Sequence, residues 1–304
     1  MIPETENKTT TFRAAGKLML FGEYIVLKGA KSLSFPLKYG QTLEVIPSKG
    51  HIEWESWSPD GCWFKASFDP QLELIETNDS QVAETLKDLL ILIKALNPSI
   101  DLQQKFKMTA DFNLKWGFGS SSTFISLLSQ WSETDPYILL ENSFGGSGYD
   151  IACAIADLPI IYQLTKDSRY STEVPIHKNL KDHMLFVYLG QKQSSKNEIA
   201  RFKKNEITNE DVQLMNDLVD KAVNTDFVEV FETLLNQSED LLSPIIGRKK
   251  LKEDIFADYN YSIKSLGAWG GDFFLATFRD LETAKNYFKS KGYTTMFTYN
   301  ELIK

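Results

Sequence analysis

The sequence has few cysteines and no long apolar run. Cys62 and Cys153 are the only cysteines among 304 residues, and they match neither a disulfide framework nor the paired spacing of a metal site. Two inert thiols are typical of a protein in a reducing compartment. No apolar run is long enough to cross a bilayer, and residues 1–6 lack the basic-then-apolar pattern of a secretory signal. We therefore expect a cytoplasmic protein without a membrane partner.

Positive charge is also in short supply. The net charge of −8 argues against a general binder of nucleic acid or of anionic membranes, although a local basic site for a phosphorylated small molecule remains compatible with it. A composition with 42% hydrophobic and 24% charged residues is typical of globular proteins. The length predicts two domains. We expect the boundary in the polar, turn-rich segment 165–182, so that residues 1–178 and 179–304 form the two domains.

Apolar patterning predicts both strands and helices along the chain. Alternating apolar residues predict antiparallel strands within 33–57, further strands at 108–114, 159–164, 184–189, 273–278 and 294–299, and a strand, a Gly-Lys turn and a second apolar segment across 12–27. Helical spacing predicts helices at 82–96, 124–131, 135–140, 149–156, 196–205, 211–242 and 282–291, and another before the glycine-rich turn at 265–272. Thr208 or Asn209 is the expected N-cap of the long helix, with a break near 224–226 and a stop at Pro244.

A glycine- and serine-rich stretch at residues 116–123 lies between a predicted strand and a predicted helix. Its sequence is Trp-Gly-Phe-Gly-Ser-Ser-Ser-Thr. Glycine lets the backbone turn tightly and approach a ligand closely. The free N–H groups at the start of a helix attract an anion such as phosphate. The stretch is therefore a candidate phosphate loop, and a turn that only caps the helix is the alternative.

Three further stretches combine glycine with charged residues. Residues 16–24 contain Gly-Lys and Gly-Glu-Tyr, and a lysine beside glycine can reach phosphate oxygens or stabilise an alkoxide. Residues 145–150 place Asp150 after three glycines, where a carboxylate can act as a base or orient a substrate. Residues 265–273 form a glycine loop before a strand. Taken singly, these stretches favour an exposed turn lysine, a first-turn helix carboxylate and a tight connection over a functional site.

Together and in this order, the stretches resemble the signature motifs of the GHMP kinase superfamily, named for galactokinase, homoserine kinase, mevalonate kinase and phosphomevalonate kinase. Residues 15–24 resemble its Pro-Gly-Lys…Gly-Glu-His/Tyr motif, residues 117–122 its Gly-Leu-Gly-Ser-Ser-Ala loop, and residues 267–272 its Gly-Ala-Gly-Gly-Gly-Asp/Gly loop. Residues 146–152 resemble the segment with the family's catalytic aspartate and contain the Gly-Tyr-Asp-Ile-Ala run of a bacterial subgroup. Within the superfamily the sequence is most similar to the phosphomevalonate kinases.

The resemblance implies a two-domain α+β fold, in which an N-terminal domain like the second domain of ribosomal protein S5 precedes a ferredoxin-like C-terminal domain. It also implies ATP and Mg²⁺ as cofactors and a small-molecule acceptor. Carried over position by position, it implies catalytic roles for Lys17 and Asp150 and contacts to ATP from Gly117, Gly119, Ser120, Ser121, Ser122, Gly267, Ala268, Gly270 and Gly271. Ser121 and Glu141 are the implied Mg²⁺ ligands, although the spacing from Glu141 to Asp150 differs from that in mevalonate kinase.

The acceptor's identity depends on residues outside the ATP loops. Glu23 and Tyr24 of the first motif are candidate substrate contacts. A phosphomonoester acceptor is largely dianionic, since its second pKa is about 6, so extra cations should bind it. Lys192, Lys196 and Arg201 are the candidates, and a solvated basic helix face is the alternative.

The expected activity is phosphorylation of phosphomevalonate in isoprenoid precursor synthesis, with mevalonate as the alternative acceptor. In-line positioning and charge cancellation drive such a transfer, with Asp150 accepting or orienting a proton and Lys17 stabilising the incipient alkoxide. A diphosphomevalonate decarboxylase and a catalytically silent ligand sensor on the same fold are the remaining alternatives. Trp269, which replaces a family glycine, is the hint of a sensor; it either shapes the acceptor pocket or points outward. A monomer and a homodimer both stay open.

Overall fold

The computed structural model describes residues 8–190, 207–267, 269 and 272–304. Contacts between residues divide the chain into two compact units. The first contains residues 8–16, 39–114 and 118–155, and the second contains residues 17–38, 115–117 and 156–304, apart from those not described. The units are interleaved in the sequence, and the single domain boundary expected after residue 178 stays a prediction. Among the described residues, no helix is both long and apolar enough to cross a membrane.

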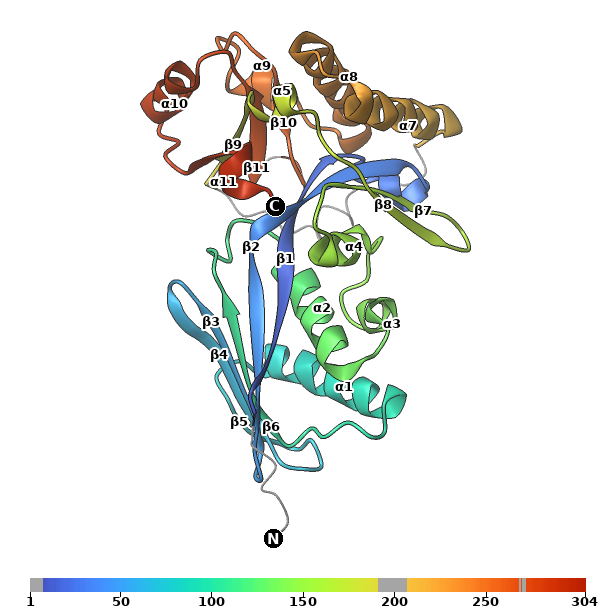
Figure 1. The fold of residues 1–304 in the computed structure, drawn as a ribbon, viewed down its shortest axis with the longest axis vertical. Coiled ribbons are helices and arrows are strands. Elements are labelled where there is room, and N and C mark those ends of the chain that lie inside the picture. Colours follow the sequence, from blue (N-terminus) through green and yellow to red (C-terminus); the bar gives the residue numbers. More distant parts are fainter. Residues whose placement is uncertain (1–7, 191–206, 268, 270–271) are drawn as a thin grey trace. The chain divides into compact units, whose positions relative to one another are not determined.

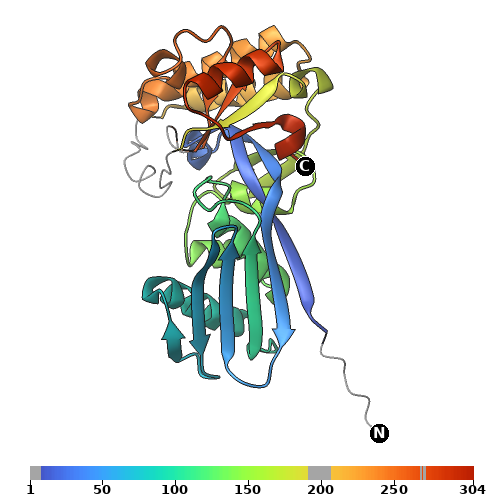
Figure 2. The same ribbon diagram turned by 90° about the vertical axis from the view of Figure 1, so that its left-hand side faces the viewer.

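A mixed sheet and four helices build the first unit (Figures 1 and 2). Its strands are β3 (Ile52–Ser58), β4 (Gly61–Phe68), β5 (Leu74–Thr77) and β6 (Gln104–Ala110), with parts of the long strands β1 (Thr10–Phe21) and β2 (Lys31–Pro47). Its helices are α1 (Ser80–Leu96), α2 (Ser120–Ser132), α3 (Pro136–Glu141) and α4 (Tyr149–Ile155). The strand order is β5-β4-β3-β6-β2, with β1 paired to β2.

Buried apolar side chains join the helices to this sheet. Helix α1 begins at Asp79, whose carboxylate accepts hydrogen bonds from the backbone N–H groups of Gln81 and Val82, both at 3.1 Å. Its buried residues recur at helical spacing: Ala83, Leu86, Leu89, Leu90 and Ile93. On the sheet side, Phe106 of β6 stacks on Trp54 at 5.1 Å between ring centroids and meets Trp131 of α2 edge-on at 4.7 Å.

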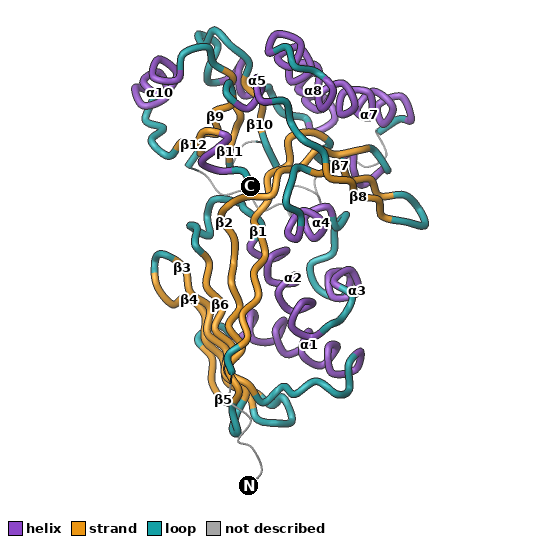
Figure 3. Tube along the Cα trace, viewed as in Figure 1, coloured by secondary structure: helices purple, strands orange, loops and turns teal. Residues whose placement is uncertain are grey.

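The second unit contains a four-stranded antiparallel sheet in the order β10-β11-β9-β12. Its strands are β9 (Met184–Tyr188), β10 (Ile263–Ser265), β11 (Phe273–Thr277) and β12 (Met296–Thr298), and its longer helices are α7 (Asn209–Asn224), α8 (Val228–Ile246) and α10 (Leu281–Ser290). Chain order β-αα-β-β-α-β with strand order 2-3-1-4 is the ferredoxin-like topology, which confirms that expectation. Helices α7 and α8 lie side by side (Figure 3).

Shorter elements complete the second unit. These are the 3₁₀ helix η1 (Ile25–Lys28), strands β7 (Ile160–Leu164) and β8 (Arg169–Glu173), and helices α5 (Lys178–Lys181), α9 (Leu251–Asp254) and α11 (Tyr299–Leu302). Strand β7 pairs with the first residues of β2, from Lys31 to Ser34, and with β8. The hairpin β7–β8 occupies part of segment 165–182, where the sequence predicts only turns. Phe256, Phe274 and Phe288 pack together in the core of the unit.

Several local expectations are confirmed. The helical pattern after residue 208 breaks between α7, which ends at Asn224, and α8, which begins at Val228. Thr208 caps α7 in a reciprocal capping box with Asp211. The predicted helix 196–205 lies outside the described residues.

Other local expectations are wrong. Gly16 and Lys17 do not form a turn, because β1 continues through both. A Cβ at Gly16 would lie 3.0 Å from the carbonyl oxygen of Phe118 and 3.1 Å from that of Tyr39, so the glycine permits a close backbone approach within a strand. Strand β10, not a helix, precedes the third glycine-rich stretch. Helix α8 runs past Pro244 to Ile246, because a proline this close to the end disturbs only the final turn.

The antiparallel strands predicted within 33–57 are confirmed in direction, since β2 and β3 run antiparallel. The two strands do not pair with each other. Strand β6 lies between them, antiparallel to β2 and parallel to β3. Strand β6 lies earlier in the chain than predicted, at Gln104–Ala110 rather than 108–114. Strand β12 is shorter than predicted, since Tyr299 begins α11.

Candidate functional site

Aromatic contacts attach the start of the glycine- and serine-rich stretch to the small sheet of the second unit. The indole of Trp116 meets the rings of Phe297 and Phe273 edge-on, at 5.4 Å and 6.4 Å between centroids. The hydroxyl of Tyr188 donates a hydrogen bond to the carbonyl of Lys115 at 3.1 Å. These contacts fix the backbone that leads into Gly117.

Gly117 is a glycine because a carboxylate occupies the place of its side chain. Its φ is +70°, and a Cβ there would lie 2.2 Å from Oδ2 of Asp272. Asp272 is 7% exposed and directly precedes β11. At Gly267, whose φ is +64°, a Cβ would lie 3.9 Å from the same oxygen. Asp272 therefore approaches residues of two predicted ATP-binding stretches.

Lys17 reaches the same place from β1. Its ammonium donates a hydrogen bond to the carbonyl of Gly117 at 3.2 Å. The lysine of the first motif and the first glycine of the second are thus direct neighbours, although 100 positions separate them in the sequence. An ammonium is suited to an anionic ligand.

The remaining residues of the second motif begin α2 in the first unit. Gly119 caps the helix with φ +86°, and its carbonyl accepts the first helical hydrogen bond, from the N–H of Thr123 at 3.0 Å. The preceding N–H groups, at Ser120, Ser121 and Ser122, therefore have no acceptor within the helix. Ser121 is exposed, whereas Ser122 is buried and donates to the carbonyl of Gly119 at 2.8 Å. Such a helix start suits a phosphate oxygen.

Asp150 lies in the first turn of α4, also in the first unit. Its Oδ1 accepts a hydrogen bond from the backbone N–H of Ile151 at 3.1 Å, and the side chain is partly buried. Glu141, the implied acidic Mg²⁺ ligand, is the last residue of α3 and is exposed. The roles of both residues stay predictions.

Glu23 lies in a buried ion cluster. Its Oε1 is 2.8 Å from Nζ of Lys264 in β10, and the two side chains are 1% and 0% exposed. Nζ of Lys264 is also 3.7 Å from Oε1 of Glu239 in α8, a side chain that is 2% exposed. Tyr24, the residue after Glu23, is 7% exposed and has φ +63°. The described ion-pair partner of Glu23 is therefore a lysine, and contact of Glu23 and Tyr24 with substrate stays a prediction.

Other predicted site residues have no described structure. Lys192, Lys196, Arg201, Ala268, Gly270 and Gly271 lie outside the described residues. Trp269 is described and is 1% exposed, so the outward orientation is wrong for this side chain. Its carbonyl accepts a hydrogen bond from the guanidinium of Arg248.

Three polar residues of these clusters were not predicted from the sequence. Asp272 stands inside the third motif, and its position after three glycines was the available signal. Lys264 and Glu239 carried no local signal, because a buried lysine in a strand and a buried glutamate in a helix become visible only through their tertiary partners. Burial raises the pKa of Glu239 to about 7, an effect that Lys264 opposes and Glu23 adds to.

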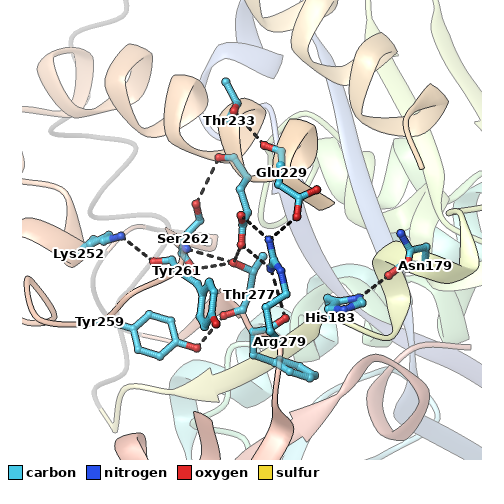
Figure 4. Close-up of polar contacts among 12 residues, drawn as sticks. Asn179, His183, Glu229, Thr233, Lys252, Tyr259, Tyr261, Ser262, Thr277 and Arg279 are labelled. Atoms are coloured by element: carbon cyan, nitrogen blue, oxygen red, sulfur yellow. Dashed lines mark hydrogen bonds and ion pairs between the residues drawn. The ribbon is translucent and has the colours of Figure 1, made fainter. Parts of the chain in front are cut away.

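A second polar network anchors α8 at the far end of β11 (Figure 4). Arg279 donates to carboxylate oxygens of Glu229 and Glu232, each at 3.0 Å, and its guanidinium lies over the ring of Tyr261 at 5.0 Å. The hydroxyl of Thr277 donates to Glu232 at 2.6 Å. Both carboxylates are paired with the guanidinium, so we assign this network a role in packing α8 on the sheet.

Comparison with known proteins identifies the fold. No protein family and no characterised protein matches the sequence. The phosphomevalonate kinase of Streptococcus pneumoniae, solved with phosphomevalonate and AMPPNP, matches with TM-score 0.72 and 16% identity over 95% of this chain and 99% of that chain. The mevalonate kinase of L. major, solved with R-mevalonate, matches with TM-score 0.66 and 18% identity over 95% and 93%. The galactokinase of Lactococcus lactis, solved with galactose, matches with TM-score 0.70 and 14% identity over 97% and 94%.

These neighbours confirm the superfamily resemblance at the level of fold. The chain has the two-domain α+β fold of the GHMP kinases. The particular subgroup suggested by Gly-Tyr-Asp-Ile-Ala stays a prediction.

The close contact between Asp272 and Gly117 can be tested by substitution. Gly117→Ala is expected to destabilise the protein by about 1–2 kcal/mol for the left-handed backbone and by a further ~1–3 kcal/mol for displacing the carboxylate. Gly247→Ala is the matched control, since Gly247 also has φ +70° but open space around its Cβ. Urea unfolding measures both losses. Equal losses would show that Asp272 does not restrict position 117, and Asp272→Ala should remove the excess.

Proposed function

We propose that the chain is an ATP-dependent kinase of the GHMP type that phosphorylates a small molecule, with phosphomevalonate as the acceptor. The observation that carries this proposal is the hydrogen bond from Lys17 to Gly117, which joins the lysine of the first motif to the predicted phosphate loop. The fold supports it, since a mevalonate kinase, a phosphomevalonate kinase and a galactokinase share this fold. One neighbour was solved with an ATP analogue and phosphomevalonate.

The residues present suit a triphosphate. The N–H groups of Ser120, Ser121 and Ser122, which have no acceptor within α2, can donate to phosphate oxygens. The ammonium of Lys17 balances negative charge that develops during transfer. Ser121, exposed at the helix start, is suited to bind the Mg²⁺ that accompanies ATP, and Glu141 is the acidic candidate. Mg²⁺ would supply charge neutralisation on the phosphates.

Asp150 would act on the acceptor. With an alcohol acceptor its carboxylate takes or orients the hydroxyl proton. A phosphomonoester acceptor is already an anion, so orientation becomes the larger part of its role. The cations required for such an acceptor would come from Lys192, Lys196 and Arg201, in addition to Lys17.

An acceptor panel tests the proposal. ADP release from Mg·ATP is measured with phosphomevalonate and mevalonate offered separately, with galactose and homoserine as controls, while CO₂ is monitored. We expect turnover with phosphomevalonate alone and no CO₂. Turnover with mevalonate alone would replace the acceptor, CO₂ release would indicate a decarboxylase, and acceptor binding without turnover would indicate a ligand sensor.

A further inference from the structure

Helix α8 presents two glutamates to the small sheet of the second unit. Glu232 and Glu239 are seven residues apart, which is about two helical turns and places them on one face. Glu232 accepts from the hydroxyl of Thr277 in β11. Glu239 instead accepts from the backbone N–H of Ser265 in β10, at 3.0 Å. The two glutamates therefore attach the same helix to the two sides of one hairpin.

The surroundings of Glu239 are unusual for a group that only stabilises the fold. Two carboxylates, from Glu23 and Glu239, share the single ammonium of Lys264, and all three side chains are at most 2% exposed. Among the described residues, Oε2 of Glu23 and Oε2 of Glu239 have no hydrogen-bond partner. Such a buried cluster is weak evidence for stability, because desolvation offsets the attraction. A role in specifying local geometry accounts for it better.

By accepting from the Ser265 N–H, Glu239 holds the start of the third glycine-rich stretch in place. Ser265 ends β10, and the N–H of Leu266 donates to the carbonyl of Phe273 at 3.1 Å, which closes the loop at its base. Gly267 begins the loop and Asp272 ends it, beside Gly117. Through Lys264 the cluster also holds Glu23, six residues after Lys17. Glu23 thus links the cluster to Lys17, and Ser265 links it to the stretch that ends at Asp272, beside Gly117.

We propose that Glu239 is a positioning residue that fixes Ser265 and Lys264 at the base of the third glycine-rich stretch, and that it raises nucleotide affinity more when it is ionised. This role rests on the proposed kinase function. An ionised carboxylate makes a charge-assisted hydrogen bond to the Ser265 N–H, which is stronger than a neutral one. The charged groups facing Glu239 are Lys264 of β10 and Glu23 after β1. With its pKa raised to about 7, Glu239 changes charge in the neutral range.

Direct binding of AMPPNP, measured by calorimetry at pH 6 and pH 8, tests the proposal. Glu239→Leu removes the acceptor and is expected to weaken binding about tenfold at pH 8. Glu239→Gln keeps a neutral acceptor and is expected to match the wild type at pH 6 but bind about threefold more weakly at pH 8. Comparing variants at one pH cancels the titration of the nucleotide itself. Glu232→Leu is the matched control on α8 and is expected to bind as the wild type does.

The binding results distinguish the positioning role of Glu239 from the proposed kinase function. Wild-type affinity at both pH values in both Glu239 variants would overturn the positioning role while leaving the kinase proposal intact. Equal weakening by Glu232→Leu would also overturn it, since the effect would then come from the packing of α8. A wild-type protein that binds no AMPPNP would overturn the kinase function and this role with it. If Glu239→Leu does not fold, the pH dependence of Glu239→Gln decides the question.

Discussion

Asp150→Asn is expected to lower kcat by about 10²-fold with a phosphomonoester acceptor and by up to ~10⁴-fold with an alcohol, while AMPPNP affinity changes little. The amide oxygen of asparagine can still accept the hydrogen bond from the Ile151 N–H, so the start of α4 is kept. The amide cannot take a proton from the acceptor. An alcohol needs that proton removed, whereas a phosphomonoester is already an anion, so the size of the loss reports the acceptor class.

Asp135→Asn is the matched control for this change. Asp135 caps α3 through the N–H of Tyr137 at 2.8 Å, so the substitution removes the same charge at another helix start of the same unit. Its kcat is expected to stay within about twofold of wild type, because asparagine caps helices as well as aspartate. Unchanged turnover in Asp150→Asn would remove Asp150 from the catalytic role. Equal losses in both variants would attribute the effect to the helices.

Local patterns in the sequence predict much of the fold. Helix α1 is visible from its apolar spacing, and the ferredoxin-like unit is expected from the family resemblance. Patterns do not predict which strands pair, because β6 comes from beyond α1 and still inserts between β2 and β3. Gly16 illustrates the same limit. It resembles a turn residue locally, but the reason for it is the carbonyl of Phe118 close by.

The same distinction between local patterns and distant partners applies to the candidate site. The glycine- and serine-rich motifs are contiguous in the sequence and can be recognised there. The partners that hold them are not contiguous. Lys264 is 241 positions from Glu23, and neither residue alone predicts the other. Both side chains are buried, and each requires the other because a charge away from water requires a counter-charge. The structure adds the tertiary contacts of the motifs, whereas the motifs themselves can be recognised in the sequence.

Lys264→Met is expected to destabilise the protein by about 3–5 kcal/mol, because it leaves two carboxylates buried without their ammonium. Urea unfolding at pH 7 measures the loss. Lys291→Met is the matched control. Lys291 pairs with Asp258 at 3.0 Å on the surface, with side chains 31% and 65% exposed, and such pairs contribute about 0–1 kcal/mol. A triple variant that adds Glu23→Gln and Glu239→Gln should recover much of the stability.

The loss in Lys264→Met is also expected to depend on pH. Burial raises the pKa of Glu239 to about 7 and raises that of Glu23, so the folded state binds protons more tightly than the unfolded state. Stability from these protons is fully present below the unfolded pKa of about 4.5 and is lost as the pH rises through the folded values. Without the ammonium both folded pKa values rise further. The difference between wild type and variant should therefore be small at pH 5 and grow toward pH 8. A difference that does not change with pH would show that the two carboxylates are not the source of the destabilisation.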